Sequence, residues 1–247
     1  MKLLPLFVAA AALLLAAPAA RAQDDPGMSM FNSYNQMAVN MSLVEVNNAA
    51  VMAASRNATA GKRGFDKLYP SSRSVSLAYT PSATLKQQTV QEMGRKLQAS
   101  NPAAGQAFTK ALGPGKADYG QLFGEMVKAS GLPANNAATA LAAYLEVGYA
   151  IVNDVQDDKS ITPVMDQGLQ RQAAGLLSAN KNLTSSAAVA KLGEEMKLQT
   201  VLLYLGWQSV RKSGQTAQFR SNIAQQFKQK GLDMSAVRLT TQGLVKK

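Results

Sequence analysis

Carboxylates are the groups in this sequence that could carry acid–base chemistry. Glu146 lies in the apolar stretch 136–154, where burial would raise its pKa and suit it to act as a general acid, as in glycoside hydrolysis. On a helical wheel it falls with Ala143, Ala150 and Asn153, away from the leucines and tyrosines. The sequence places no second carboxylate opposite it, so a partly solvated or hydrogen-bonded, non-catalytic Glu146 is favoured and an envelope hydrolase is the alternative.

Histidine and cysteine are both absent from the 247 residues. Their absence excludes Ser-His-Asp and thiol catalysis, zinc sites built on histidine or cysteine, and iron–sulfur clusters. No glycine-rich loop has the spacing of a phosphate-binding or dinucleotide-binding turn. We therefore expect no cofactor, and the sequence favours a non-enzymatic protein.

Two further groups of acids look structural. Glu194 and Glu195 are neighbours in a predicted helix and point in different directions, so we expect both to be solvated, with Glu195 pairing with Lys191. A charged turn holds three aspartates, Asp154, Asp157 and Asp158. Their oxygens could hold a weakly bound calcium ion, but the spacing is not that of an EF-hand loop.

Methionines are the other possible metal ligands. Four of them lie close together near the N-terminus: Met28, Met30, Met37 and Met41. Thioethers select Cu(I), so this segment could bind copper. The alternative is that Met37 and Met41 pack on a helix face while Met28 and Met30 lie in a mobile tail, and this alternative is favoured.

Positive charge is concentrated at the C-terminal end. The chain has a formal charge of +11, and residues 211–247 hold eight basic residues and a single acid, Asp233. Such a segment attracts anionic envelope components such as phospholipid, cell-wall polymer or polysaccharide, or another exported protein. The alternative is a solvated basic face without a dedicated partner. The candidate contacts are Arg211, Lys212, Arg220, Lys228, Lys230 and Arg238.

The aromatic residues of this region argue against nucleic acid as the partner. Trp207, Phe219 and Phe227 fall on predicted core stripes of helices. They do not alternate with the basic residues at the spacing that base stacking needs.

The N-terminus has the layout of a signal peptide. Lys2 precedes an apolar run over residues 3–17, and Ala20-Arg21-Ala22 resembles a cleavage site. The run is shorter than the ~20 residues of a membrane span, and no later run is long enough to be one. An uncleaved anchor is the alternative. We expect residues 1–22 to be removed, which lowers the formal charge to +9, and the protein to be secreted or periplasmic.

The remaining chain divides into a leader and a domain. Residues 23–64 are expected to form a loosely ordered, methionine-rich leader with a possible helix at 37–54. Residues 65–247 are expected to form one helical domain, because apolar residues recur there at helical spacing. We predict a mostly α fold, a multi-helix, orthogonal or bundle-like domain. The helix over 136–154 should lie at its centre, and that over 185–213 should be the longest.

Two short segments alternate apolar and polar residues like strands, 75–79 and 237–241. We predict that they pair as a small two-stranded sheet that fastens the end of the chain. Before the second segment, Gly231 has the position of a left-handed residue that ends a helix, with Leu232 folding back onto the helix and Asp233 capping the next turn.

Three stretches carry a resemblance to a known family. They are "AYTPS" (78–82), "GLPANNAATALAAYL" (131–145) and "GLDMSAVRLTTQG" (231–243). Together they resemble an uncharacterised family of exported, mostly helical bacterial proteins, over about residues 75–245. The family pattern ends in Gly-Phe where this chain has Gly243-Leu244.

The middle helix of the family often carries an acidic residue and a tryptophan where this chain has Asn136 and Tyr149. The resemblance implies no activity, so it carries no functional residue over to this chain.

Overall fold

The computed structural model of the chain describes residues 76–113, 115–180, 183–214 and 216–247. This part is mostly helical with a small two-stranded antiparallel sheet, which confirms the predicted fold class. The predicted signal peptide, the leader with its helix at 37–54 and its four methionines lie outside the described residues. The elements are α4 (Ala83–Ser100), α5 (Pro102–Leu112), α6 (Tyr119–Val127), α7 (Ala137–Val152), α8 (Pro163–Ser178), α9 (Ser186–Ser213), α10 (Thr216–Gln229), β1 (Val237–Thr240) and β2 (Gly243–Lys246), with 3₁₀ turns η3 (Lys128–Ser130), η4 (Asp158–Ser160) and η5 (Met234–Ala236).

Polar side chains at the helix starts explain where most helices begin. The Ser82 hydroxyl accepts a hydrogen bond from the Leu85 N–H at 3.0 Å, and Thr162 caps α8 ahead of a proline in its first turn. Of the two adjacent asparagines before α7, Asn136 rather than Asn135 accepts the first N–H groups of that helix. Asn135 is thereby free to take another role.

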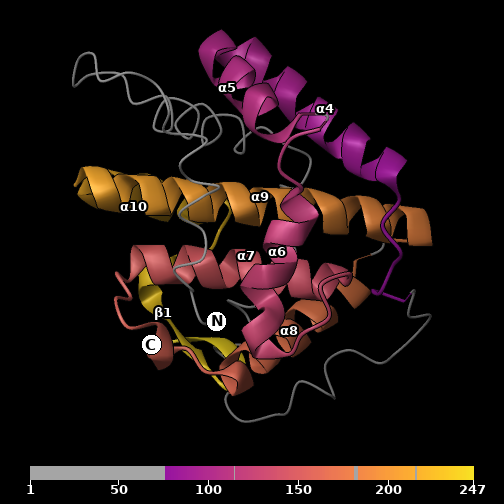
Figure 1. Cartoon of the computed structure of the whole chain (residues 1–247). Helices are drawn as coiled ribbons and strands as arrows, with labels where there is room; N and C mark the ends of the chain where they lie inside the picture. The colour runs from indigo at the N-terminus through magenta and orange to yellow at the C-terminus, as the bar shows by residue number, and fades with distance from the viewer. Residues whose placement is uncertain (1–75, 114, 181–182, 215) are drawn as a thin grey trace.

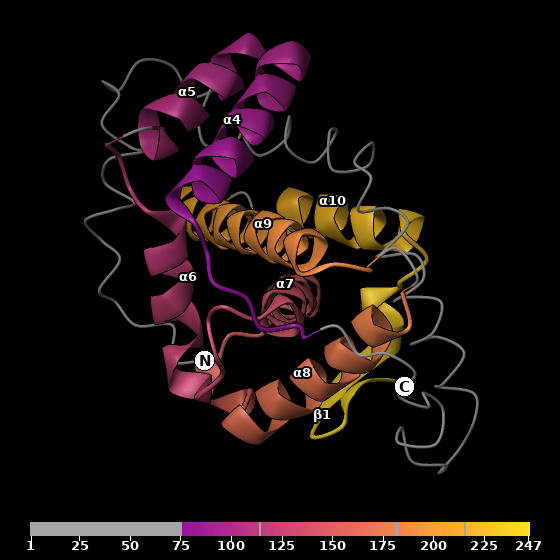
Figure 2. The ribbon, with the colours of Figure 1, turned by 90° about the vertical axis from the view of Figure 1, so that its right-hand side faces the viewer.

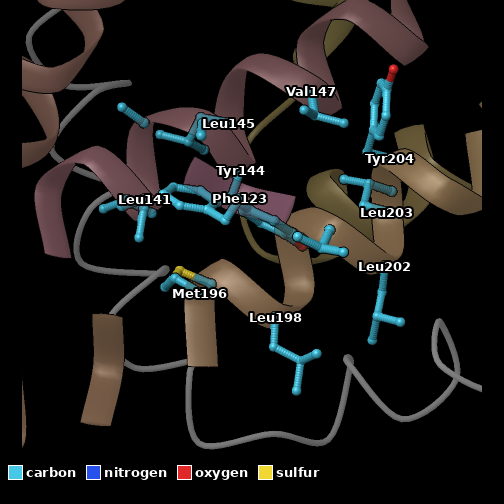
Figure 3. Packing of buried hydrophobic residues seen from close by; sticks show 14 of the residues in the cluster. Phe123, Leu141, Tyr144, Leu145, Val147, Met196, Leu198, Leu202, Leu203 and Tyr204 are labelled. Atoms are coloured by element: carbon cyan, nitrogen blue, oxygen red, sulfur yellow. The ribbon is translucent and has the colours of Figure 1, made fainter. Parts of the chain in front are cut away.

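Helix α7 lies at the centre of the domain. Figure 2 shows it end-on, with α6, α8, α9 and α10 around it and the α4–α5 pair beyond α9. Thirteen of its sixteen residues are buried, so it has no solvent face, as its alanine-rich sequence predicts. Figure 3 shows Phe123 of α6, Tyr144 of α7 and Met196 of α9 meeting in the core.

The sheet is a hairpin at the end of the chain. β1 and β2 are antiparallel, and the buried side chains of Leu239 and Leu244 lie opposite each other. The predicted pairing of 75–79 with 237–241 is wrong. Because only two residues separate β1 from β2, this sheet closes at a far lower cost in chain entropy than one between distant segments.

The first described residues pair with the start of α7 instead. The Tyr79 N–H donates to the Asn135 carbonyl (3.1 Å), the Ala137 N–H donates to the Leu77 carbonyl (2.9 Å), and Ala78 forms an isolated antiparallel bridge with Asn136. The segment 76–80 therefore lies across the loop that leads into α7.

The turn after α10 forms as the sequence predicts. Gly231 has φ of 83°, the Leu232 N–H donates to the Phe227 carbonyl (2.9 Å) and the Gly231 N–H to the Lys228 carbonyl (2.9 Å). These are the two bonds of a Schellman motif. The Asp233 carboxylate accepts from the Ser235 N–H at 3.0 Å and so starts η5.

Within the described ranges, no helix combines the length and the apolar character that crossing a bilayer requires.

Candidate functional site

One group of polar side chains, the Glu194 cluster, joins four parts of the fold, with Tyr119, Glu194 and Lys197 buried, Tyr79 half-buried and Asn135 exposed. It consists of Tyr79, Tyr119, Asn135, Glu194 and Lys197. Glu194 on α9 accepts hydrogen bonds from the hydroxyls of Tyr79 (2.8 Å) and Tyr119 (2.6 Å). The Lys197 ammonium lies 2.7 Å from both the Glu194 carboxylate and the Asn135 side-chain oxygen.

The cluster is balanced in charge. Glu194 and Lys197 are 0% and 1% exposed, and the ion pair compensates each for the loss of water. Burial, together with the Glu194 charge and hydrogen bonds, raises the pKa of both tyrosines, so they remain protonated donors. Burial lowers the pKa of Lys197 although Glu194 favours its charge. Each of the five side chains bonds to another member of the cluster, so the cluster acts as a structural fastener.

The prediction that Glu194 is solvated was wrong. Lys197 lies three residues after Glu194 on the same face of α9. This i,i+3 spacing was the feature of the sequence that could have predicted the ion pair. The glycine at position 193 was a second signal that this face of α9 is covered. A Cβ there would lie 2.3 Å from the Tyr79 ring, so only glycine leaves room for it. The pairing of Glu195 with Lys191 (3.9 Å) is confirmed.

A second buried group, the carboxyl pair, consists of Glu146 and Asp166. Glu146 projects from the central helix α7 and is 6% exposed. Asp166 lies in the first turn of α8 and is 1% exposed. A hydrogen bond joins the two side chains, so α8 supplies the second carboxylate that the sequence did not identify.

The surroundings of Glu146 favour its protonated form. Burial, followed by the negative charge of Asp166 and the hydrogen bond to it, raises the pKa of Glu146 well above the ordinary value. We therefore assign a proton to Glu146.

The carboxyl pair has the acid–base composition of a hydrolase but not its access. A protonated acid beside an ionised one is the arrangement that carboxylate enzymes use. Here both side chains are closed into the interface between α7 and α8. This burial, rather than any lack of a partner, separates the pair from a working active site.

The six basic residues predicted to contact an anionic partner fall into two groups, four exposed and two at least partly buried. Arg211, Lys212, Lys228 and Arg238 are exposed, and Arg211 lies over the Trp207 ring with its guanidinium carbon 6.0 Å from the ring centre. The other two do not lie on an exposed basic surface.

Arg220 joins α10 to the end of α7. Its Nη1 is 2.8 Å from Asp154 Oδ2, and its Nη2 donates to the Val152 carbonyl at 3.2 Å. This pairing occupies one aspartate of the charged turn, and Asp157 caps the N–H of Lys159. Among the described residues, no three acids gather as a metal site.

Lys230 is buried at the end of α10, 4% exposed. Its ammonium lies 5.7 Å from the centre of the Tyr144 ring, and burial lowers its pKa to about 8. In the part of the chain that the structure describes, no carboxylate lies within ion-pair distance of it. No pattern in the sequence predicts this burial, because Lys230 follows the polar residues Lys228 and Gln229 and stands directly before a glycine.

The chain belongs to a family of unknown function, DUF6683, whose model matches residues 3–247. No curated protein and no solved structure matches the chain. The family is consistent with the uncharacterised family that the motifs suggest, and it assigns no activity.

Proposed function

We propose that this chain is a non-enzymatic exported protein that binds anionic groups of the cell envelope through cations of its C-terminal segment. One observation carries the proposal. Six of the eight basic residues of segment 211–247 are exposed, and within the described residues none of the six forms an ion pair with an aspartate or glutamate. These six, the exposed cations, are Arg211, Lys212, Lys228, Arg238, Lys246 and Lys247.

The surroundings of the exposed cations support the proposal. The single acid of the segment, Asp233, is occupied by its hydrogen bonds with Ser235, which lower its pKa and keep it in place. Figure 1 shows α10, β1 and the C-terminus toward one end of the domain. Positive charge that the local structure leaves unbalanced attracts phosphate and carboxylate groups.

The association is proposed to be electrostatic, without insertion into a bilayer. Val164 is the one large hydrophobic side chain that stands exposed in the described part, and it lies at the start of α8. An apolar anchor beside the exposed cations is therefore lacking among these residues, and binding must weaken as salt screens the charges.

The test compares two variants that lose the same charge. In the first, Arg211, Lys212, Lys228 and Arg238 become glutamine; in the matched control, the exposed residues Arg95, Lys110, Lys116 and Lys159 do. Binding to vesicles with anionic lipid should fall about a hundredfold or more in the first variant, at about 1 kcal/mol per cation, and much less in the control. Equal losses, or binding that is indifferent to salt, would contradict the proposal.

Two further arms identify the anion and the compartment. Vesicles of neutral lipid and a soluble anionic cell-wall polymer distinguish a lipid surface from a free polymer. N-terminal sequencing of the protein from a periplasmic fraction should begin at Gln23, and a chain that still begins at Met1 would contradict export with cleavage.

A hydrolase remains the second candidate, because Glu146 has Asp166 as a partner. It requires the closed interface of α7 and α8 to open to a glycan or peptide. Glu146→Gln would abolish hydrolysis of envelope polymers in this case and would leave binding by the exposed cations unchanged.

A further inference from the structure

We propose that the contact between α7 and the end of α10 is a binding site for a small carboxylate. Three side chains form this site, the donor triad: Tyr144 of α7, Gln226 of α10, and Lys230 directly after α10. All three are more than nine-tenths buried, and each has a hydrogen-bond donor without an acceptor among the described residues. The donor triad shares no residue with the exposed cations, so this proposal does not depend on the proposed function.

A glycine of α7 explains why α10 approaches so closely. At Gly148 a Cβ would lie 2.3 Å from the Phe227 ring, so the absence of a side chain lets this ring pack against the helix backbone. The rings of Phe227 and Tyr144 lie 5.3 Å apart, centre to centre. Lys230 comes three residues after Phe227, on the same side of the helix. Its ammonium lies over the Tyr144 ring, 5.7 Å from the ring centre.

Gln226 belongs to the same place because it lies four residues before Lys230, the spacing of neighbours on one helix face. Both side chains are 4% exposed. The Gln226 amide nitrogen has no acceptor in the described part of the chain, and Lys230 forms no hydrogen bond or ion pair there. The contact between the two helices therefore gathers an amide, an ammonium and a phenol that all offer hydrogens.

The protonation states of the donor triad strengthen this reading. Burial raises the pKa of the Tyr144 hydroxyl, and no hydrogen bond contributes to that shift. Burial lowers the pKa of Lys230 to about 8, so the ammonium remains mostly charged at neutral pH. Buried donors without acceptors destabilise a fold, and each one calls for an explanation. An acceptor from outside the chain would satisfy all three at once.

The composition of the donor triad selects the ligand. One ammonium neutralises one negative charge, so a monoanion leaves the buried site neutral, whereas a phosphate dianion would leave an excess charge there. A carboxylate carries that single charge on two oxygens that together accept several hydrogen bonds. One oxygen can accept from Lys230 while the other accepts from Tyr144 or Gln226. These hydrogen bonds would be charge-assisted and therefore strong.

The donor triad lies near the surface although its side chains are buried. Gln229 and Gly231, the residues on either side of Lys230, are exposed. Lys230 is therefore one side chain's length from solvent at the place where α10 ends. A small outward movement of this end admits the ligand, and Gly231, with φ of 83°, is the residue at which the backbone turns.

Thermal unfolding of the full-length protein tests the site with three probes. Sodium acetate is the smallest carboxylate, N-acetylalanine represents the carboxyl end of a peptide, and N-acetylalanine amide has the same shape as the latter without the charge. Each is titrated at pH 7 against sodium chloride of equal ionic strength. We expect at least one of the two carboxylates to raise the unfolding midpoint in a saturable way, and the amide to have no effect. A response to acetate indicates a small free acid, and a response to N-acetylalanine alone indicates a peptide end.

Three variants assign the response to the donor triad. Lys230→Met should abolish it, and Tyr144→Phe and Gln226→Leu should each weaken the apparent affinity about tenfold or more, since each removes a hydrogen bond to a charged group. Lys228→Met is the matched control, because Lys228 is an exposed lysine in the last turn of the same helix. Tyr144→Phe and Gln226→Leu keep the test decisive if Lys230→Met does not fold.

Three results would overturn the site. They are carboxylate curves in wild type that coincide with sodium chloride, as expected if water alone satisfies these donors; a response that survives in Lys230→Met; and a response that Lys228→Met loses equally. Vesicle binding measured in parallel keeps the two proposals separate. Lys230→Met should bind anionic vesicles like wild type, and the variant with four exposed cations changed to glutamine should keep its response to carboxylates.

Discussion

Glu194 and Glu146 are both buried glutamates. The side chains around each of them decide its charge and its role. Glu194 has a cation and two hydroxyl donors within hydrogen-bond distance. Glu146 has another acid and therefore keeps its own proton. Burial alone fixes neither the charge nor the role of a carboxyl group. A complete set of donors makes a fixed fastener, whereas an acid facing an acid makes a group that responds to pH.

The largest expected effect comes from removing the cation of the Glu194 cluster. Lys197→Met leaves the Glu194 charge buried with only the two tyrosine donors, which should lower the free energy of unfolding by about 3–5 kcal/mol. Urea denaturation measures the change.

Lys191→Met is the matched control, because Lys191 is exposed and its ion pairs should contribute less than about 1 kcal/mol. The double variant Glu194→Gln/Lys197→Met should recover much of the loss. If Lys197→Met and Lys191→Met cost the same, the cluster is not the fastener described here.

The tyrosine donors give the next effect. Tyr119→Phe removes a hydrogen bond to a buried charge and should cost about 1.5–3 kcal/mol. Tyr79→Phe removes the longer bond from a less buried residue and should cost less. Denaturation midpoints of the two variants rank them. The reverse order would mean that Tyr79, on the segment 76–80, holds the cluster together.

The carboxyl pair should show the opposite response to loss of charge. Glu146→Gln keeps the shape and a donor for Asp166 but cannot ionise. Wild-type stability should fall as pH rises above 4.5, by up to about 1.4 kcal/mol per pH unit within the window, and this fall should be absent in the variant. Thermal unfolding across the same pH range measures it. A wild-type profile that rises with pH would contradict the protonation of Glu146.

The sequence predicted the helices better than the sites, for a physical reason. The turn at Gly231 depends on a few neighbouring residues, and it was predicted from the chain alone. Partners such as Asp166 for Glu146 lie on another helix, so no spacing within one segment reveals them.

The strand pairing failed in a related way. The alternation in 75–79 and 237–241 identified extended segments but not their neighbours. The second segment pairs with residues 243–246, which follow it directly in the chain. The loop between them is short, so pairing costs little conformational entropy. The first segment met the start of α7 through backbone bonds, which carry no signature in side-chain type.

Lys230 is a third buried ionisable group to compare with Glu194 and Glu146. Among the described residues it has neither an oppositely charged nor a like-charged partner. Its pKa is lowered to about 8 from an ordinary 10.5, so the unfolded chain holds the proton more tightly. Stability should therefore rise as pH increases between about 8 and 10.5, and Lys230→Met should remove this rise.

At pH 7, Lys230→Met removes the desolvation cost of the ammonium, which stabilises the fold, and also removes the contact with the Tyr144 ring, which destabilises it. The net gain should be on the order of 1 kcal/mol, the smallest of the four effects. Chemical denaturation at pH 7 and pH 10 measures both parts, with exposed Lys228→Met as the control. A loss of stability at pH 7 would mean that the contact with the ring outweighs the burial of the charge, and that Lys230 belongs with the satisfied groups of the Glu194 cluster.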